Sequence, residues 1–364
     1  MKILLTATDV GSARQNLSFA ENCLSKNFDV IFKILVIGPA RDIFRNSLMS
    51  AVDFDFKSYN NYKLAKQNLE KIVEDFQPDF VLVGLSFLGD SIDELVREIA
   101  KEKLLPCGVI QDYWGYLGGF DLDSLPDVFF VLDKEASRLT EYKTGGQANC
   151  IITGSPKHEV YKEKISGWME EQPLKSPYRK NIVFIGQPSE IVGIFENFKI
   201  FLNTANQLKG SIKIYFKPHP SDMGYLPQYE EVLKVQRQPY EIIGNNIGIE
   251  AILCQADIII TCFSTSGIDH NYLQFYANKP LGELVYLTVG NELLNYIEQA
   301  VGMAEIPGTK SGMGTLCKSK EELQITLQKS LLGCSSEYSK KVKNCLGMKN
   351  SPTQMIFNYI QALI

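Results

Sequence analysis

Short hydrophobic runs alternate with longer amphipathic segments along the first half of the chain. The runs predict strands over 2–7, 32–38, 80–86, 107–112, 128–133 and 148–156. The amphipathic segments predict helices over 13–26, 61–76 and 91–103. Strands that alternate with helices in this way indicate right-handed β-α-β crossovers and a parallel sheet.

A second series of the same kind begins after a polar segment. Residues 166–180 contain two prolines and show no useful period, which predicts an interdomain linker. Beyond it, predicted strands over 181–187, 211–216, 256–261 and 280–287 alternate with predicted helices within 190–209, over 227–236 and from Gly267. Residues 351–364 predict a final capped amphipathic helix.

The pattern therefore predicts an α/β protein with two Rossmann-like parallel-sheet domains, 1–165 and 181–350, that face a cleft. Ligands of such folds bind outside the carboxyl ends of the strands. The residues that directly follow each predicted strand are therefore the candidates for function.

Composition limits the partners of this protein. The chain has 364 residues, which is enough for two domains, and its 45% hydrophobic and 22% charged residues are typical of a globular protein. A net charge of −5 gives no overall attraction for nucleic acid or an anionic membrane, so an anionic ligand needs a local site. No stretch approaches the roughly 20 apolar residues that span a bilayer. We expect a cytoplasmic protein; peripheral attachment at the inner face of the membrane and a homo-oligomer stay open.

Motifs for metal, disulfide and dinucleotide chemistry are absent from the sequence. The eight cysteines form no C-x-x-C pair, which indicates reduced thiols. There is no D-x-D, no G-x-S-x-G elbow and no G-x-G-x-x-G after the first strand. His158 is interpreted as a solvated surface residue and His270 as an ordinary helix-face residue. We expect no metal and no cofactor.

A proline-flanked histidine follows the strand over 211–216, in Lys217-Pro218-His219-Pro220. Proline fixes its own φ and disfavours helix in the preceding residue, so Lys217 and His219 are both expected to be extended. This predicts a stiff bracket with a cation and an imidazole side by side. The alternative is a rigid strand exit without chemistry.

A hydroxyl cluster, Ser264-Thr265-Ser266, follows the strand over 256–261 and leads into a helix. Hydroxyls and backbone N–H groups at a helix N-terminus form an anion site. Plain capping is the alternative, since Ser266 and Asp269 have the spacing of an N-cap pair.

The bracket and the cluster lie one β-α-β crossover apart in the sequence, and we expect them to face each other across one end of the sheet. Lys217 would supply charge to a phosphate, and His219 would donate a hydrogen bond to it. Gly186 and Gln187, which end the strand over 181–187, are the third candidate at this edge. Such donors stabilise the charge that develops when a nucleotide departs.

The two motifs in this order resemble those of GT-B-fold glycosyltransferases. The similar families are bacterial sialyltransferases and polysialyltransferases that use CMP-sialic acid, capsule Kdo transferases, and CDP-glycerol glycerophosphotransferases. The resemblance implies that His219 and Ser264–Ser266 hold the donor phosphate. It also implies metal-independent, inverting transfer of a sugar from a nucleotide-activated, in particular CMP-linked, donor to a glycan or surface-polysaccharide acceptor. Residues 181–350 would then bind the donor and 1–165 the acceptor, with 351–364 able to pack back on the acceptor domain.

The acceptor and the base are expected in the N-terminal half. Gln111 and Asp112 follow the strand over 107–112, and the aromatic Tyr113 and Trp114 come next. Aromatic faces suit sugar rings and a carboxylate suits general-base work. A packed loop with ordinary aromatic contacts is the alternative. The sialyltransferase Asp/Glu-Asp/Glu-Gly triplet is absent, so Asp112 is a candidate base by position alone.

Two further strand ends in this half carry polar residues. Asp9, Gly11 and Ser12 lie between the first strand and the first helix, where Asp9 is as well suited to cap as to bind. Ser86 ends the strand over 80–86. We predict all four on the acceptor side.

Two other functions stay open. The stretches "QPDFVLVGLS" and "IITGSP" are similar to the N-terminal half of UDP-N-acetylglucosamine 2-epimerases, although the donor-site signatures of those enzymes are not evident after "ADIIIT". A protein that binds a nucleotide sugar without chemistry is the third reading, because the base triplet is missing.

Overall fold

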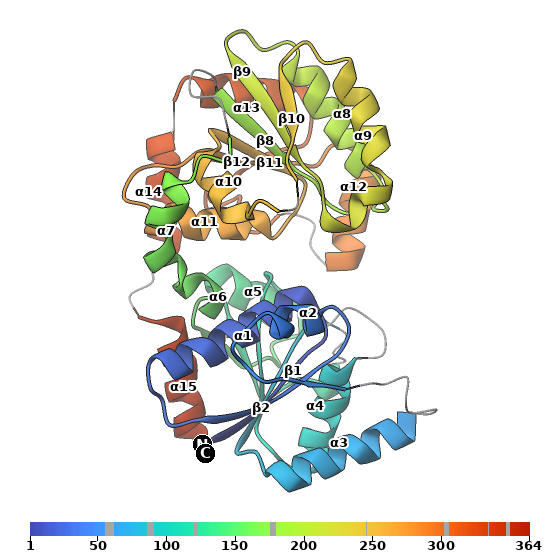
Figure 1. Cartoon of the computed structure of the whole chain (residues 1–364), viewed down its shortest axis with the longest axis vertical. Helices are drawn as coiled ribbons and strands as arrows, with labels where there is room; N and C mark the ends of the chain where they lie inside the picture. Colours follow the sequence, from blue (N-terminus) through green and yellow to red (C-terminus); the bar gives the residue numbers. More distant parts are fainter. Residues whose placement is uncertain are drawn as a thin grey trace. The chain divides into compact units, whose positions relative to one another are not determined.

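A computed structural model of the chain describes residues 1–54, 62–85, 91–118, 122–174, 180–244, 246–301, 306–333, 335–346 and 350–364 (Figure 1). The chain forms two compact units. Unit 1 consists of Met1–Val160 and Met348–Ile364, and unit 2 of Tyr161–Gly347.

Unit 1 contains a parallel sheet, as the alternation of strands and helices predicts. Its strands, in sheet order, are β3 (Val52–Asp53), β2 (Ile31–Val36), β1 (Lys2–Ala7), β4 (Phe80–Val83), β5 (Cys107–Ile110), β6 (Val128–Val131) and β7 (Cys150–Ile152). All six neighbouring pairs in this order are parallel. The chain moves outward from β1 in one direction and then, from β4, in the other, so the topological switch point lies between β1 and β4.

The helices of unit 1 cover both faces of this sheet. They are α1 (Val10–Ser25), α2 (Ala40–Arg45), α3 (Tyr62–Phe76), α4 (Ile92–Glu102), η2 (Leu122–Ser124), α5 (Lys134–Lys143), α6 (Pro156–Glu159) and α15 (Pro352–Leu363). Along β1, Ile3 and Leu5 belong to the hydrophobic core on the α1 side. Thr6 has the opposite parity, and its hydroxyl donates to Asp93 of α4. Helices α1 and α4 therefore lie on opposite faces of β1.

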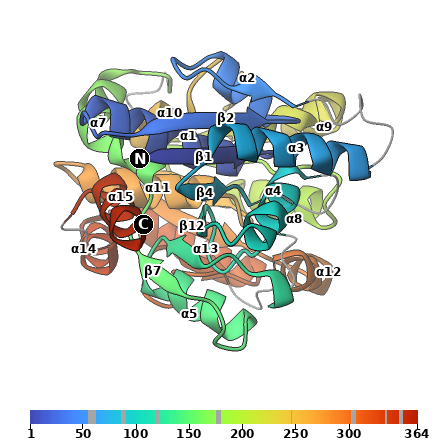
Figure 2. The same cartoon turned by 90° about the horizontal axis from the view of Figure 1, so that it is seen from below.

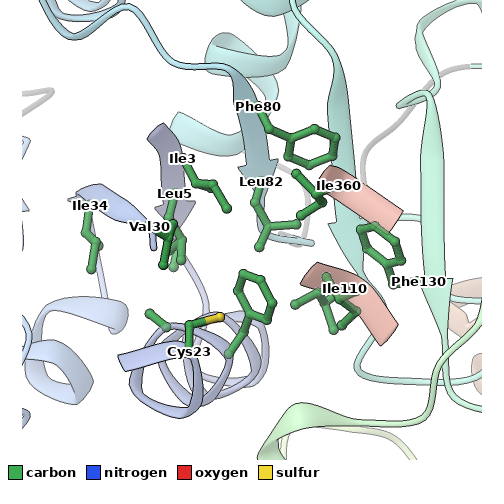
Figure 3. Packing of buried hydrophobic residues seen from close by; sticks show 14 of the residues in the cluster. Ile3, Leu5, Cys23, Val30, Ile34, Phe80, Leu82, Ile110, Phe130 and Ile360 are labelled. Atoms are coloured by element: carbon green, nitrogen blue, oxygen red, sulfur yellow. The ribbon is translucent and has the colours of Figure 1, made fainter. Parts of the chain in front are cut away.

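The C-terminal helix α15 is part of the unit 1 core. Ile356 and Ile360 are completely buried, and the ring centroid of Phe357 lies 4.2 Å from that of Phe28. Figure 3 shows Ile360 beside Phe80 and Leu82 of β4. Burial of each such side chain contributes about 1.5–3 kcal/mol. Both chain ends consequently lie close together on unit 1 (Figures 1 and 2).

Unit 2 repeats this plan with a six-stranded parallel sheet. In sheet order the strands are β10 (Tyr240–Ile242), β9 (Ile212–Lys217), β8 (Lys180–Ile185), β11 (Ile258–Thr261), β12 (Glu283–Leu287) and β13 (Thr315–Cys317). Every neighbouring pair is parallel. The switch point lies between β8 and β11, so β8 stands between β9 and β11.

The helices of unit 2 pack around an aromatic core. They are α7 (Tyr161–Glu170), α8 (Ile194–Ala205), η3 (Pro220–Gly224), α9 (Leu226–Lys234), α10 (Ile249–Gln255), α11 (Ser266–Tyr276), α12 (Asn291–Tyr296), η4 (Ile297–Val301), α13 (Lys320–Leu331) and α14 (Ser335–Leu346). Phe216 of β9 stacks on Tyr229 of α9, with ring centroids 4.5 Å apart, and lies 4.7 Å from Phe198 of α8. These buried rings fix the end of β9 against the two helices.

The predicted linker over 166–180 begins inside a helix. Helix α7 buries Tyr161 and Ile165, and the Tyr161 ring packs edge-on against Trp168 at 5.1 Å. Residues 166–170 of the predicted linker are therefore helical, and a few tertiary contacts stabilise this helix although its sequence lacks a clear hydrophobic period. In the described part of the chain, no helix has the length and apolar character that a membrane span requires.

Candidate functional site

Three loops leave the carboxyl edge of the unit 2 sheet at its switch point, after β8, β9 and β11. The loops after β9 and β11, which carry the His219 bracket and the hydroxyl cluster, both leave this edge, and β8 lies between their strands. With strands about 4.8 Å apart, the two strand ends are roughly 10 Å from each other.

Gly186 and Gln187 occupy this gap. The Gly186 N–H donates to Lys217 O at 2.8 Å, and a Cβ on Gly186 would lie 3.2 Å from the backbone nitrogen of His219. The Gln187 side chain is buried and its Oε1 accepts from the N–H of Phe263 at 2.8 Å. Gly186 therefore adjoins the His219 loop, while Gln187 fixes the loop that follows β11.

His219 presents one ring nitrogen to a ligand. Its Nδ1 accepts from the backbone N–H of Ser221 at 3.3 Å and lies 2.8 Å from the Ser221 hydroxyl. An N–H group can only donate, so Nδ1 of the neutral ring carries no hydrogen and Nε2 does. Nε2 has no partner within the described residues, and the ring is half-buried. Burial lowers the pKa of His219, partly offset by the nearby Asp222, which favours the neutral ring.

The hydroxyl cluster lies at the start of α11. Helix α11 begins at Ser266, so Ser266 is not its N-cap; the Ser264 hydroxyl accepts from the Ser266 N–H at 3.2 Å instead. The N–H groups of Gly267 and Ile268 donate back to the carbonyls of Ser264 and Thr265. The N–H groups of Ser264 and Thr265 themselves have no partner within the described residues. Two consecutive N–H donors and the exposed Thr265 hydroxyl thus remain available at a helix N-terminus.

Lys217 does not lie beside His219 as a phosphate contact, which corrects the bracket prediction. Its side chain is only 9% exposed, and Nζ donates to the carbonyl of Gly244 at 2.8 Å. Gly244 follows β10, on the side of β9 away from β8. Burial lowers the pKa of Lys217. The lysine joins two strand ends instead of facing the switch point.

Asp222 is a residue that the sequence reasoning missed. Its carboxylate is buried and accepts from both the N–H and the hydroxyl of Ser189, at 2.9 and 2.7 Å. Ser189 lies in the loop after β8, so this contact joins the loops after β8 and β9. The signal in the sequence was the continuation of the histidine motif as His219-Pro220-Ser221-Asp222.

In unit 1, Asp112 lies against the first turn of α1. A Cβ on Gly11 would be 2.0 Å from Oδ2 of Asp112, so only glycine leaves room for this carboxylate. Oδ1 is buried and has no partner within the described residues. Burial raises the pKa of Asp112 to about 6, and the nearby Asp9 contributes in the same direction. Gly11 and Asp112 are thus brought together, and Asp9 is close enough to act on Asp112.

Ser12 and a buried carboxylate, Asp93, occupy the switch point of unit 1. Ser12 is 1% exposed and its hydroxyl donates to Asp9 O at 3.2 Å. A Cβ on Gly84 would meet both Ser12 and Asp93 at less than 3.0 Å. The Gly84 N–H donates to Asp93 at 2.9 Å. These contacts join β1, β4 and α4. Ser86 lies outside the described residues.

Gln111, Tyr113 and Trp114 belong to the interior, which does not fit their predicted contact with a sugar. Gln111 is completely buried, and its amide donates to Tyr116 O and to Thr140. Trp114 is 2% exposed, and its indole N–H donates to Asp133 at 2.9 Å. The aromatic rings form the packed base of the loop, and of residues 111–114 Asp112 is the one that is not fully buried.

The two other histidines are buried, which corrects the surface prediction for His158. Its Nδ1 lies 2.7 Å from the buried hydroxyl of Ser155, which also bonds Gln15. His270 donates from Nε2 to Gly282 O at 2.8 Å, and burial lowers its pKa to about 4. In the described residues no three His, Cys, Asp or Glu side chains form a group that could hold a metal ion.

Comparisons with known proteins identify a fold and no family. No family model matches the chain, and no curated protein matches it either. UDP-GlcNAc 2-epimerase from Methanocaldococcus jannaschii matches with a TM-score of 0.68 at 13% identity, over 100% of both chains. The Neisseria meningitidis UDP-GlcNAc 2-epimerase, bound to UDP-GlcNAc, matches with 0.65 at 16% identity, over 100% of both chains. MurG from Acinetobacter baumannii matches with 0.63 at 11% identity, over 99% of both chains.

The chain has a GT-B-type fold. The prediction of two Rossmann-like parallel-sheet domains is therefore confirmed. The three solved structures share this fold with the chain, and their names concern UDP-sugar enzymes and MurG. None of the three names a CMP-linked donor, so that part of the resemblance remains a proposal.

Proposed function

We propose that this chain is a metal-independent, inverting glycosyltransferase that uses a nucleotide sugar as donor and a glycan or surface polysaccharide as acceptor. One observation carries the proposal. At the switch point of unit 2, the Nε2–H of His219 and the N–H groups of Ser264 and Thr265, which have no partner in the described part of the chain, lie on either side of β8. Hydrogen-bond donors at a helix N-terminus and an imidazole suit the phosphate of a departing nucleotide.

Neutral donors dominate this phosphate site. His219 is favoured as a neutral ring, and Lys217 is occupied at Gly244. A neutral imidazole can still donate from Nε2 to a phosphate oxygen. The partial positive charge of the α11 N-terminus adds electrostatic stabilisation without a cation.

Asp112 is the proposed general base on unit 1. A carboxylate with a pKa of about 6 is ionised at neutral pH and still basic enough to accept a proton. In the proposed step, the acceptor hydroxyl gives its proton to Asp112 while its oxygen bonds to the anomeric carbon. The bond from that carbon to the phosphate oxygen breaks, and the nucleotide leaves with the electron pair.

The donor nucleotide is open between two candidates. The resemblance of the His219 and Ser264–Ser266 motifs favours a CMP-linked donor. The solved structures of similar fold favour a UDP-linked one, since their names include UDP-GlcNAc.

An isomerase or hydrolase acting on a nucleotide sugar is the second candidate. Two solved UDP-GlcNAc 2-epimerases match this chain over its whole length, which favours that reading. The same phosphate site would serve it, because an epimerase also holds a nucleotide sugar. A reaction without any acceptor separates the two functions.

Two measurements test the proposal. A thermal-shift series with CMP, CDP, UDP, GDP and ADP should show stabilisation by one nucleotide class, because a ligand that binds only the folded state raises its stability. The matching nucleotide sugar is then incubated with and without a pool of glycan acceptors. A transferase releases nucleotide only with an acceptor, whereas an epimerase converts the sugar alone. Absence of stabilisation by all five nucleotides would overturn both functions.

A further inference from the structure

Asp222 links two of the loops that form the phosphate site of unit 2. It is 1% exposed, and its carboxylate accepts two hydrogen bonds from Ser189 in the loop after β8. Its own N–H donates to the carbonyl of His219 at 2.9 Å. One buried side chain therefore holds the loop after β8 while its backbone closes the turn after His219.

The contact between Asp222 and Ser189 lies beyond the last paired residues of β8 and β9. The last paired residues of β8 and β9 are Ile185 and Lys217, followed by the single bond from Gly186 N to Lys217 O. The loops after β8 and β9 leave the paired part of the sheet beyond that bond. The Asp222–Ser189 contact connects them there.

The link is also anchored in the core. The Ser189 hydroxyl lies 2.7 Å from the hydroxyl of Tyr229, which is 1% exposed and stacks on Phe216 of β9. A chain of contacts thus runs from the aromatic core through Ser189 to Asp222 and the His219 turn. Buried, fully bonded networks of this kind restrict a loop to one arrangement.

We propose that Asp222 is a positioning residue of the phosphate site, which holds the Nε2–H of His219 toward the edge of the sheet by locking the loops after β8 and β9 together. This inference rests on the proposed function for its ligand, a nucleoside phosphate. The geometric part, that Asp222 controls the His219 ring, stands on the contacts within unit 2 alone.

Two substitutions distinguish the hydrogen bonds by which Asp222 holds the loops together from the effect of its negative charge. Asp222→Asn can keep the lock, because the amide oxygen accepts from the Ser189 N–H and the amide nitrogen donates to the Ser189 hydroxyl. Asp222→Ala removes both bonds. Tyr229→Phe is the matched control, since it removes one hydroxyl of the network and leaves the Asp222–Ser189 bonds in place.

The chain has three histidines, so ¹⁵N spectra of the imidazoles can report on His219 directly. His219→Gln assigns its signals. We expect the wild type, Asp222→Asn and Tyr229→Phe to show the Nε2–H tautomer. Asp222→Ala should show averaged tautomers. The titration midpoint of His219 should move to lower pH in both Asp222 variants, because Asp222 raises the pKa of that ring.

UDP and CMP are the binding probes. For whichever of them binds the wild type, Asp222→Ala should weaken affinity about tenfold, as expected for one poorly placed hydrogen bond. Asp222→Asn should restore affinity to within about threefold of the wild type. If Asp222→Ala does not fold, Ser189→Ala tests the same link by removing one of its two bonds, with a smaller change in the same spectra.

The outcomes distinguish the two proposals. An unchanged Nε2–H tautomer of His219 in Asp222→Ala, or equal loss of affinity in the Asn and Ala variants, would overturn the positioning role. If neither nucleotide binds the wild type while the His219 tautomers are averaged in Asp222→Ala and not in Asp222→Asn, the lock stands and the proposed function fails.

Discussion

The two units share one sheet topology and present opposite chemistry at their switch points. In unit 1 the edge next to α1 carries carboxylates, Asp112 and Asp9, and burial keeps the pKa of Asp112 raised. In unit 2 the edge next to α11 carries hydrogen-bond donors, His219 Nε2 and the N–H groups of Ser264 and Thr265. The same strand order thus places different side-chain chemistry at the two edges, because a few loop residues determine which groups lie there.

The largest expected effect comes from Asp112→Asn, which removes the proton acceptor from unit 1. If Asp112 is the general base, kcat should fall by about 10²–10⁴-fold. The folded pKa of about 6 lies above the ordinary pKa of 3.8 for an aspartate, so the folded state prefers the protonated carboxyl. Stability is therefore lost as the pH rises from 3.8 to about 6, and the Asn variant should be more stable at pH 7 by up to about 3 kcal/mol.

Chemical denaturation of both proteins at pH 4 and pH 7 measures this difference. Asp75→Asn, at an exposed position of α3, is the control and should change stability by no more than about 0.5 kcal/mol. A loss of stability in Asp112→Asn at pH 7 would show that the carboxylate is a bonded structural group instead.

His219→Ala tests the donor edge of unit 2. Loss of one donor to a developing phosphate charge should lower kcat about 10²–10³-fold. His219→Gln should recover part of that loss, because its amide N–H can reach toward the position of Nε2. Steady-state kinetics with the active nucleotide sugar measure both variants. Turnover by His219→Ala close to that of the wild type would remove the imidazole from the mechanism.

His270 lies in the same unit as His219, but its ring is completely buried and has a structural role. Its folded pKa of about 4 lies below the ordinary pKa of 6.5 for a histidine, so the neutral ring stabilises the fold above pH 6.5. That stability should be lost as the pH falls from 6.5 to 4, by up to about 3 kcal/mol. Over this pH range, the free energy of unfolding of His270→Gln should fall less than that of the wild type, by this same amount, in pH-dependent denaturation. Equal pH slopes for the two proteins would contradict the assignment.

The smallest expected effect is that of Gly11→Ala, compared with Gly167→Ala. The new methyl at position 11 would overlap the Asp112 carboxylate, which must move, at a cost of about 1–2 kcal/mol. Gly167 lies within α7 with open space around it, so alanine there should stabilise by about 0.5–1 kcal/mol. Thermal unfolding measures both changes in stability. A destabilising Gly11→Ala together with a stabilising Gly167→Ala would support the contact of Asp112 with α1, and changes of the same sign would argue against it.

The candidate site residues of unit 2 could be predicted from the sequence more readily than those of unit 1. The prolines around His219 and the hydroxyls of Ser264–Ser266 are local signals, and the structure places both motifs at the switch-point edge. Lys217 and Trp114 have equally suggestive neighbours, yet both side chains are buried and bonded elsewhere. Their direction depends on Gly244 and Asp133, which are distant in the sequence, so no local pattern could reveal it.

The sequence by itself determined the two parallel-sheet units, because buried strands and amphipathic helices carry their periods in local order. Only the tertiary structure decided that β8 separates the His219 and Ser264 loops, that Asp222 binds Ser189 and that Asp112 rests on Gly11. These contacts join residues from separate strands and helices. No single segment could therefore reveal them, because strand order depends on packing between elements.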